Sequence, residues 1–382
     1  SPINLSNGGN TAFATGVGLY NFTAVYEGSF RPKESGAYEL LIEGDDGYRV
    51  YVNGEKVIDY WGEHASAKRD YTLKATAGTD YKIRIEYMQA GAEALLRFDL
   101  GIYRHISPEM VVDRVKEADI VIFAGGISPS LEGEEMYSVN SPGFAGGDRT
   151  SIELPQVQRD ILKALKKAGK KVVFVNCSGS AVALVPEMES CDAILQAWYP
   201  GQSGGLAVAD VLFGDFNPSG KLPVTFYKNT DQLPDFEDYS MKNRTYRYMT
   251  EVPLFPFGYG LSYTTFDISK GRLNKKTISA GQDLNFKVNV KNTGKYDGAE
   301  VIQVYVRKVD DAEGPIKSLR AFRRVPLKAG ETCVVSIDLL PTTFEFFDPT
   351  TNTMRIMPGK YEIMYGNSSD IPSGNKLSVT LR

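Results

Sequence analysis

Residues 118–126 read ADIVIFAGG, an unbroken apolar run that ends in two glycines. A run of this kind is typical of a parallel β-strand that is buried on both faces. A glycine-rich stretch follows at residues 127–150, and apolar residues then recur at the spacing of one helix face. These residues are Leu154, Val157, Ile161, Leu162 and Leu165. We expect the helix that they define to end at Gly169.

The alternation of strand and helix patterns continues on both sides of this segment. Ser107 and Pro108 supply a cap and a first-turn proline for a helix before the first strand. Apolar runs at residues 171–176 and 193–198 predict further buried strands, and residues 204–213 predict a helix. Strands that alternate with helices predict a parallel α/β sheet with right-handed crossovers.

Short strands of alternating polarity flank the α/β pattern at either end. Residues 48–52 alternate and lead into Asn53-Gly54, which is a strong signal for a two-residue hairpin turn. Similar strands resume after residue 265, so we predict a β-sandwich on each side. The predicted fold class is therefore multidomain, α/β plus all-β. The predicted domains are a β-sandwich at 1–104, a parallel α/β sandwich at 105–264, and an immunoglobulin-like or fibronectin type III-like sandwich at 265–382.

The bulk composition argues against several classes of function. The 382 residues carry a net charge of −4 and no basic stripe, which disfavours nucleic acid or an anionic membrane as partner. The three cysteines show neither a disulfide framework nor zinc spacing, and neither His64 nor His105 neighbours a plausible nucleophile. No apolar run reaches transmembrane length, and residues 1–18 lack the features of a signal peptide.

Acidic residues are concentrated in the glycine-rich stretch. Glu132, Glu134 and Glu135 occur close together, and the pair Asp148-Arg149 follows. Loops that leave the carboxyl ends of parallel strands are where α/β proteins bind ligands, and this loop is unusually long. A carboxyl group in it could act as a proton donor if partial burial raised its pKa. The alternative interpretation is an acidic loop exposed to solvent.

Six ordered segments are the most specific signal in the chain. They are LEGEEM (131–136), GGDRT (146–150), LPQVQ (154–158), AWYPGQSGG (197–205), NPSGKLPVTF (217–226) and FPFGYGLSYTTF (255–266). In this order they resemble the C-terminal α/β domain of the family 3 glycoside hydrolases. The resemblance implies the C-terminal portion of a retaining, exo-acting β-glycosidase that hydrolyses terminal β-linked glucosyl or xylosyl residues without a cofactor.

The same resemblance assigns roles to the acidic loop. The family's general acid/base is a glutamate of this loop, and its pattern selects Glu134, with Glu132 and Glu135 as alternatives. Asp148 and Arg149 are expected to anchor the loop. The family's nucleophile is an aspartate of a preceding (β/α)8 barrel, and this sequence contains no barrel. We therefore expect the barrel of the parent protein to be a required partner and this chain alone to be inactive.

The two flanking domains also resemble modules of this family. YEGSFRP (26–32), SGAY (35–38) and GDDGYRVYVNG (44–54) resemble a protective-antigen-like β-sandwich. Asp45 and Asp46 are then candidate calcium ligands, although two aspartates before a glycine also form an ordinary turn. Trp61 is a candidate for stacking on a sugar, whereas core packing is favoured for Trp198. VNVKNTG (288–294), GAEVIQVY (298–305) and KSLRAF (317–322) resemble a fibronectin type III-like module.

Two expectations concern the parent protein. The resemblance implies that it is secreted or periplasmic. An alternative to catalysis is a non-catalytic carbohydrate-binding or scaffolding protein, and an assay with and without the barrel distinguishes the two.

Overall fold

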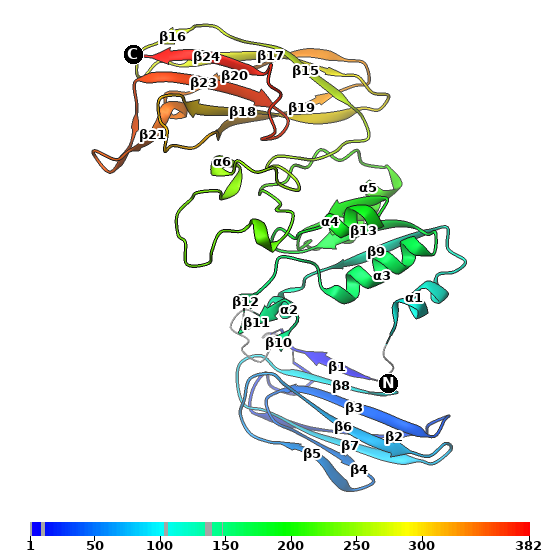
Figure 1. The fold of residues 1–382 in the computed structure, drawn as a ribbon. Coiled ribbons are helices and arrows are strands. Elements are labelled where there is room, and N and C mark those ends of the chain that lie inside the picture. The colour runs from blue at the N-terminus through cyan, green and yellow to red at the C-terminus, as the bar shows by residue number, and fades with distance from the viewer. Residues whose placement is uncertain (1, 9–11, 103–105, 134–139, 147) are drawn as a thin grey trace. The chain divides into compact units, whose positions relative to one another are not determined.

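The computed structural model describes residues 2–8, 12–102, 106–133, 140–146 and 148–382. The chain divides into two compact units, Ser1–Ile106 and Ser107–Arg382. The predicted fold class is confirmed, because the chain combines a parallel α/β sheet with β-sandwich sheets on either side of it in the sequence (Figure 1).

The first unit is a β-sandwich of two four-stranded antiparallel sheets, ordered β1-β8-β3-β6 and β2-β7-β4-β5. The strands are β1 (Ile3–Ser6), β2 (Phe22–Phe30), β3 (Gly36–Asp45), β4 (Tyr48–Val52), β5 (Glu55–Tyr60), β6 (Ala67–Ala75), β7 (Tyr81–Gln89) and β8 (Leu95–Gly101). Leu40, Tyr48 and Tyr87 are fully buried between the sheets. The predicted hairpin joins β4 to β5, and Asn53 and Gly54 both have the positive φ that this turn requires.

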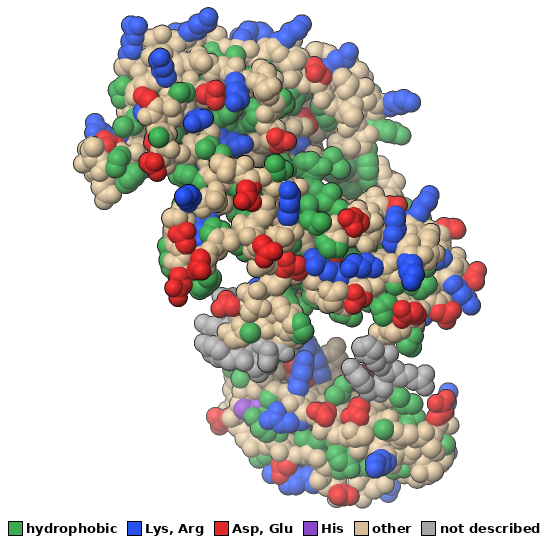
Figure 2. All heavy atoms as spheres, in the orientation of Figure 1, with side chains coloured by type: hydrophobic (Ala, Val, Ile, Leu, Met, Phe, Trp, Pro, Cys, Tyr) green, Lys and Arg blue, Asp and Glu red, His purple; other side chains and the backbone are tan. Residues whose placement is uncertain are grey.

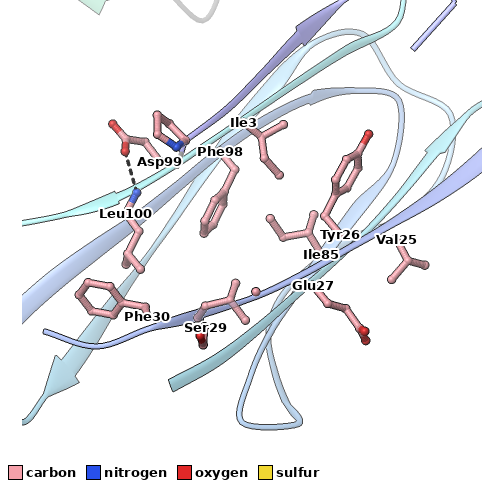
Figure 3. Close-up of a pocket in the computed structure, with 13 residues that line it drawn as sticks. Ile3, Val25, Tyr26, Glu27, Ser29, Phe30, Ile85, Phe98, Asp99 and Leu100 are labelled. Atoms are coloured by element: carbon pink, nitrogen blue, oxygen red, sulfur yellow. Dashed lines mark hydrogen bonds between the residues drawn. The ribbon is translucent and has the colours of Figure 1, made fainter. Parts of the chain in front are cut away.

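A cleft of about 560 Å³ opens between the two sheets of this unit (Figure 3). Ile3 and Phe98 come from one sheet, and Tyr26 and Ile85 come from the other. Phe98 points into the cleft, whereas Val25 points away from it. The cleft is thus a gap in the apolar layer of the sandwich.

The second unit begins with the α/β domain. Its parallel sheet has the order β14-β13-β9. The strands are β9 (Ile120–Gly126), β13 (Lys171–Cys177) and β14 (Ala193–Gln196), and the helices are α1 (Pro108–Arg114), α3 (Gln156–Lys167), α4 (Val185–Ser190) and α5 (Gly204–Phe213). Helix α3 buries Leu162 and Leu165 and ends before Gly169, as predicted. Ser107 caps α1, because its Oγ accepts from the backbone N–H of Met110.

The prediction that residues 118–126 form a strand buried on both faces is wrong in one respect. Strand β9 pairs in parallel with β13, but it is an edge strand of the described sheet. Ile120 and Ile122 are 56% and 52% exposed. Helix α5 buries none of its residues, and Phe213 at its end is 78% exposed. Hydrophobic side chains are accordingly visible on the surface of this unit (Figure 2).

The fibronectin type III-like domain follows in the same unit. Its sheets have the orders β15-β17-β20 and β16-β24-β23-β18-β19, and β21-β22 forms a separate hairpin. The strands are β15 (Phe266–Leu273), β16 (Thr277–Ile278), β17 (Leu284–Asn292), β18 (Gly298–Lys308), β19 (Ser318–Leu327), β20 (Thr332–Leu339), β21 (Glu345–Asp348), β22 (Thr353–Ile356), β23 (Gly359–Gly366) and β24 (Lys376–Leu381). Phe286, Ile302 and Ile363 are among its fully buried core residues.

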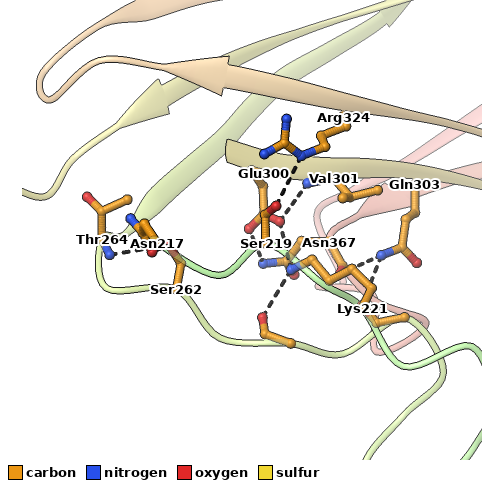
Figure 4. A network of polar contacts seen from close by, with 12 residues as sticks. Asn217, Ser219, Lys221, Ser262, Thr264, Glu300, Val301, Gln303, Arg324 and Asn367 are labelled. Atoms are coloured by element: carbon orange, nitrogen blue, oxygen red, sulfur yellow. Dashed lines mark hydrogen bonds and ion pairs between the residues drawn. The ribbon is translucent and has the colours of Figure 1, made fainter. Parts of the chain in front are cut away.

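A polar network joins the α/β domain to this last domain (Figure 4). Lys221 Nζ lies 2.7 Å from Glu300 Oε1, and Glu300 Oε2 accepts from Asn367 Nδ2 at 2.9 Å. Gln303 Nε2 donates to the carbonyl oxygen of Gly258 at 3.0 Å. Asn217 Oδ1 accepts from Ser262 Oγ and from the backbone N–H of Tyr263, at 2.8 Å each. The motifs at 217–226 and 255–266 therefore build this junction.

Candidate functional site

The candidate site lies where three loops leave the carboxyl ends of the parallel strands. One loop follows β9, one follows β13 and one follows β14, and these ends share one edge of the sheet. The first loop contains the short helix α2 (Pro129–Glu132) and a small sheet of β10 (Asn140–Ser141), β11 (Phe144–Ala145) and β12 (Asp148–Arg149). Phe144 is buried and Leu131 packs on the core of the α/β domain, so the described part of the loop is folded onto the domain.

The start of the first loop is held by Gln158 of α3. Its Nε2 donates to the carbonyl oxygen of Gly126 at 2.7 Å, and its Oε1 accepts from the N–H of Gly126 at 2.8 Å. Gly126 has φ of +125°, and a Cβ atom there would lie 1.9 Å from the carbonyl oxygen of Cys177. Only glycine fits this position, because the backbones of β9 and β13 approach so closely.

Glu132 is the one loop glutamate among the described residues, and it occupies the last position of α2. Ser128 caps this helix, because its Oγ accepts from the N–H of Leu131 at 3.2 Å. Gly133 ends it in the left-handed conformation. The carboxylate of Glu132 accepts a hydrogen bond from the hydroxyl of Tyr199, with 3.0 Å between Tyr199 Oη and Glu132 Oε2. Helix α2 is thus tied to the loop that follows β14.

Tyr199 reaches Glu132 because of the backbone before it and the space beneath it. Trp198 has a positive φ of 58°, which is uncommon for a large residue and redirects the chain after β14. The ring of Tyr199 lies on Gly179, where a Cβ atom would be 2.5 Å from Tyr199 Cε2. Burial raises the pKa of Tyr199, and the bond to Glu132 raises it further. Trp198 itself packs on the α/β core and meets Phe226 edge-on, which confirms its predicted core role.

Arg149 connects the first loop to the loop after β13. Its Nη1 donates to Ser180 Oγ at 2.9 Å and to the carbonyl oxygen of Ala181 at 3.3 Å, and its Nε donates to the carbonyl oxygen of Ser151 at 3.2 Å. Burial lowers the pKa of the guanidinium, and the Glu132 carboxylate opposes this shift. Asp148 is exposed and pairs with Ala145 between β11 and β12, whereas the side chain of Arg149 bonds to the loop after β13.

Glu134 and Glu135 lie outside the described residues, so the choice of the acid/base stays a prediction. The site brings together Glu132, Arg149 and Tyr199. The sequence does not by itself assign roles to Tyr199 or Gln158. Both lie within segments that carried the resemblance, at 197–205 and 154–158, but their function depends on contacts between distant parts of the chain.

The candidate residues of the first unit stand apart from this cluster in the sequence. Asp46 accepts from the N–H of His64 at 2.9 Å and from the N–H of Ala90 at 2.8 Å, so each of its carboxylate oxygens is already bonded to backbone. Burial, followed by the charge of Asp46, raises the pKa of Asp45. Among the described residues, no three His, Cys, Asp or Glu side chains are grouped as a metal would need. Trp61 is 40% exposed, and the guanidinium carbon of Arg49 lies 4.3 Å from its ring centroid.

The chain belongs to glycosyl hydrolase family 3. Residues 40–263 match the model of the glycosyl hydrolase family 3 C-terminal domain, and residues 300–369 match a fibronectin type III-like domain. This is the same family that the six sequence segments resemble. Within the part of the chain that the structure describes, no helix is both long and apolar enough to cross a membrane.

Related proteins are named as β-xylosidases and β-glucosidases. The chain is 51% identical to a xylan 1,4-β-xylosidase of Xylanibacter ruminicola, over 100% of this chain and 44% of the relative. It is 38% identical to a periplasmic β-glucosidase of Salmonella typhimurium, over 69% and 35% respectively. The crystal structure of a β-glucosidase from Kluyveromyces marxianus superposes with a TM-score of 0.73 at 28% identity, covering 95% of this chain and 46% of that one. The chain thus spans about half the length of such relatives or less.

Proposed function

We propose that this chain supplies the general acid/base of a retaining β-glycosidase that removes terminal β-linked xylosyl or glucosyl residues. Glu134 is the proposed acid/base. It protonates the leaving oxygen in the first step and activates water in the second. The observation that supports this best is the convergence of Glu132, Arg149 and Tyr199 at the carboxyl edge of the sheet, because Glu132 lies two residues before Glu134 in the sequence.

The nucleophile is proposed to be a carboxylate of a (β/α)8 barrel in the parent protein. Retaining enzymes hold the two carboxyl groups roughly 5–5.5 Å apart, so the barrel has to dock near this edge of the sheet. The exposed apolar residues of the second unit support a further docked domain, because Ile120, Ile122 and Phe213 are large and more than half exposed. The share of the relatives that this chain leaves unmatched is long enough to contain one.

The acid/base assignment is tested by Glu134→Gln in the barrel-containing protein. Aryl β-xylosides and β-glucosides with poor leaving groups need protonation, so their hydrolysis should fall by roughly 10²–10⁴-fold. Dinitrophenyl glycosides need little protonation and should retain more of their rate in the glycosylation step. Glu132→Gln and Glu135→Gln are the matched controls, and a leaving-group dependence found in either of them instead would move the assignment to that residue.

The proposal also predicts the behaviour of the isolated chain. The chain alone should not hydrolyse aryl β-xylosides or β-glucosides, and the chain with its barrel restored should. Turnover in neither case would favour a carbohydrate-binding or scaffolding role. We further propose that the parent protein is secreted or periplasmic, which the name of the Salmonella relative supports and cell fractionation of the source organism tests.

A further inference from the structure

We propose that Tyr199 is a positioning residue of the proposed active site, and that it acts by holding the Glu132 carboxylate and with it helix α2. This inference rests on the proposed function and deepens it. It assigns a role to a side chain that is neither an acid nor a nucleophile in the proposed reaction. Its basis is the contact between two loops that are far apart in the sequence.

The Tyr199 hydroxyl joins helix α2 to the loop after β14 through its hydrogen bond to Glu132. Helix α2 has four residues, Pro129–Glu132, and isolated helices of that length are not stable in water. Its own backbone bonds span a single turn: the N–H groups of Leu131 and Glu132 donate to the carbonyl oxygen of Ser128, at 3.0 Å each, and the N–H of Gly133 donates to that of Pro129 at 2.9 Å. A hydrogen bond from a phenol to a carboxylate is charge-assisted and therefore stronger than a neutral one.

Tyr199 is itself held in one orientation. Its ring lies on Gly179, and the unusual backbone at Trp198 directs it there. Backbone strain of this kind persists only where the surrounding structure enforces it, and it is concentrated at functional sites. A tyrosine that only covered the surface would not need a left-handed residue before it and a glycine beneath it.

Electrostatic interactions also connect Glu132 to its neighbours. Among the described residues, Tyr199 bonds to the Glu132 carboxylate, and the charges of Glu132 and Glu153 both act on Arg149. A carboxylate that accepts a hydrogen bond from Tyr199 and interacts with the charge of Arg149 can hold helix α2 in place. Glu132 precedes the proposed acid/base by two residues in the sequence.

The role is tested first in this chain, without any substrate. Hydrogen exchange of the Glu132 and Gly133 amides is measured in the wild type, in Tyr199→Phe and in Tyr263→Phe. Tyr263 is a matched control, because it is similarly exposed and its hydroxyl donates to the carbonyl oxygen of Val211 instead. We expect exchange at both amides to become roughly tenfold faster in Tyr199→Phe, which corresponds to the loss of one charge-assisted hydrogen bond, and to be unchanged in Tyr263→Phe.

The catalytic consequence is tested in the barrel-containing protein. Tyr199→Phe should lower kcat about tenfold for a glycoside with a poor leaving group, and change KM and the rate on a dinitrophenyl glycoside much less. In a Glu132→Ala background, Tyr199→Phe should have no further effect, because the hydroxyl acts through that carboxylate. The proposal would be overturned if Tyr199→Phe lowered kcat equally in the wild-type and Glu132→Ala proteins. It would also be overturned if the Glu132 and Gly133 amides of Tyr199→Phe exchanged at the wild-type rate. Failure of the acid/base assignment would show separately, as retained activity of Glu134→Gln on poor leaving groups.

Discussion

Lys221 and Glu300 form a buried ion pair between the α/β domain and the fibronectin type III-like domain, with 2.7 Å between Lys221 Nζ and Glu300 Oε1. Their side chains are only 12% and 6% exposed. Glu300 also accepts from the N–H of Val301 at 2.7 Å and from Asn367 Nδ2, so both of its carboxylate oxygens are bonded. A buried charge that is held in this way fixes the relation of two domains, because any other arrangement leaves it unpaired.

Lys221→Met should therefore destabilise the second unit. Removing one partner of a buried pair leaves the other charge uncompensated, so we expect the free energy of unfolding to fall by roughly 3 kcal/mol. Urea denaturation of that unit measures the change. The double variant Lys221→Met, Glu300→Leu should recover most of it, and Lys166→Met, which removes the exposed pair with Asp192, should change stability little. A destabilisation of the double variant as large as that of Lys221→Met would argue against the ion pair as the cause.

Glu153 should make the stability of the second unit depend on pH. Burial alone would raise its pKa, but hydrogen bonds from Ser151 and Thr230 outweigh burial and lower the pKa from 4.5 to about 2. A pKa that is lower in the folded state contributes stability above pH 4.5, and this contribution is lost as pH falls towards 2. The stability difference between wild type and Glu153→Gln should be constant above about pH 5 and shrink below it. Thr230→Val removes the 2.6 Å bond from Thr230 Oγ1 and should raise the Glu153 pKa observed by NMR titration.

Gly126→Ala should disturb the start of the acidic loop. The added Cβ would lie 1.9 Å from the Cys177 carbonyl oxygen at a φ that only glycine adopts easily, so β9 and β13 must move apart. We expect a loss of at least about 2 kcal/mol in unfolding free energy, combining strain and steric conflict. Gly205→Ala in α5 is the control, because nothing lies within 4 Å of its added Cβ, and it should leave stability unchanged or slightly raised. Equal stability of the two variants would mean that the two backbones are further apart than described.

Trp61 should report sugar binding by the first unit if it stacks on a ligand as predicted. Arg49 covers one face of its ring, so only the opposite face is open to a sugar. The chain has two tryptophans, and Trp198→Phe leaves Trp61 as the single emitter. Titration with a β-linked xylo-oligosaccharide should shift its fluorescence saturably, and Trp61→Ala should weaken binding measured by calorimetry several-fold. If the fluorescence does not change during the titration, Trp61 is not a sugar-binding residue.

The predictions that held concern patterns within a few residues. Asn53-Gly54 turns a hairpin, Ser107 caps a helix, and residues 204–213 form α5. Each of these three features depends on local backbone preferences and on one or two hydrogen bonds between neighbouring residues. A short segment of sequence is enough to specify both. The expected burial of residues 118–126 failed at Ile120 and Ile122, because burial depends on what covers a strand and the strand's own composition does not reveal it.

The sequence by itself determined the order of strands and helices, the parallel α/β sheet, the sandwiches beside it and the family to which the six segments point. Tertiary structure alone decided that Tyr199 bonds to Glu132, that Gln158 clamps Gly126 and that Lys221 meets Glu300. The partners in each pair are separated by between 32 and 79 residues, for example 67 for Tyr199 and Glu132. Such contacts form only after the sheet has brought the ends of its strands together, and no local preference encodes them.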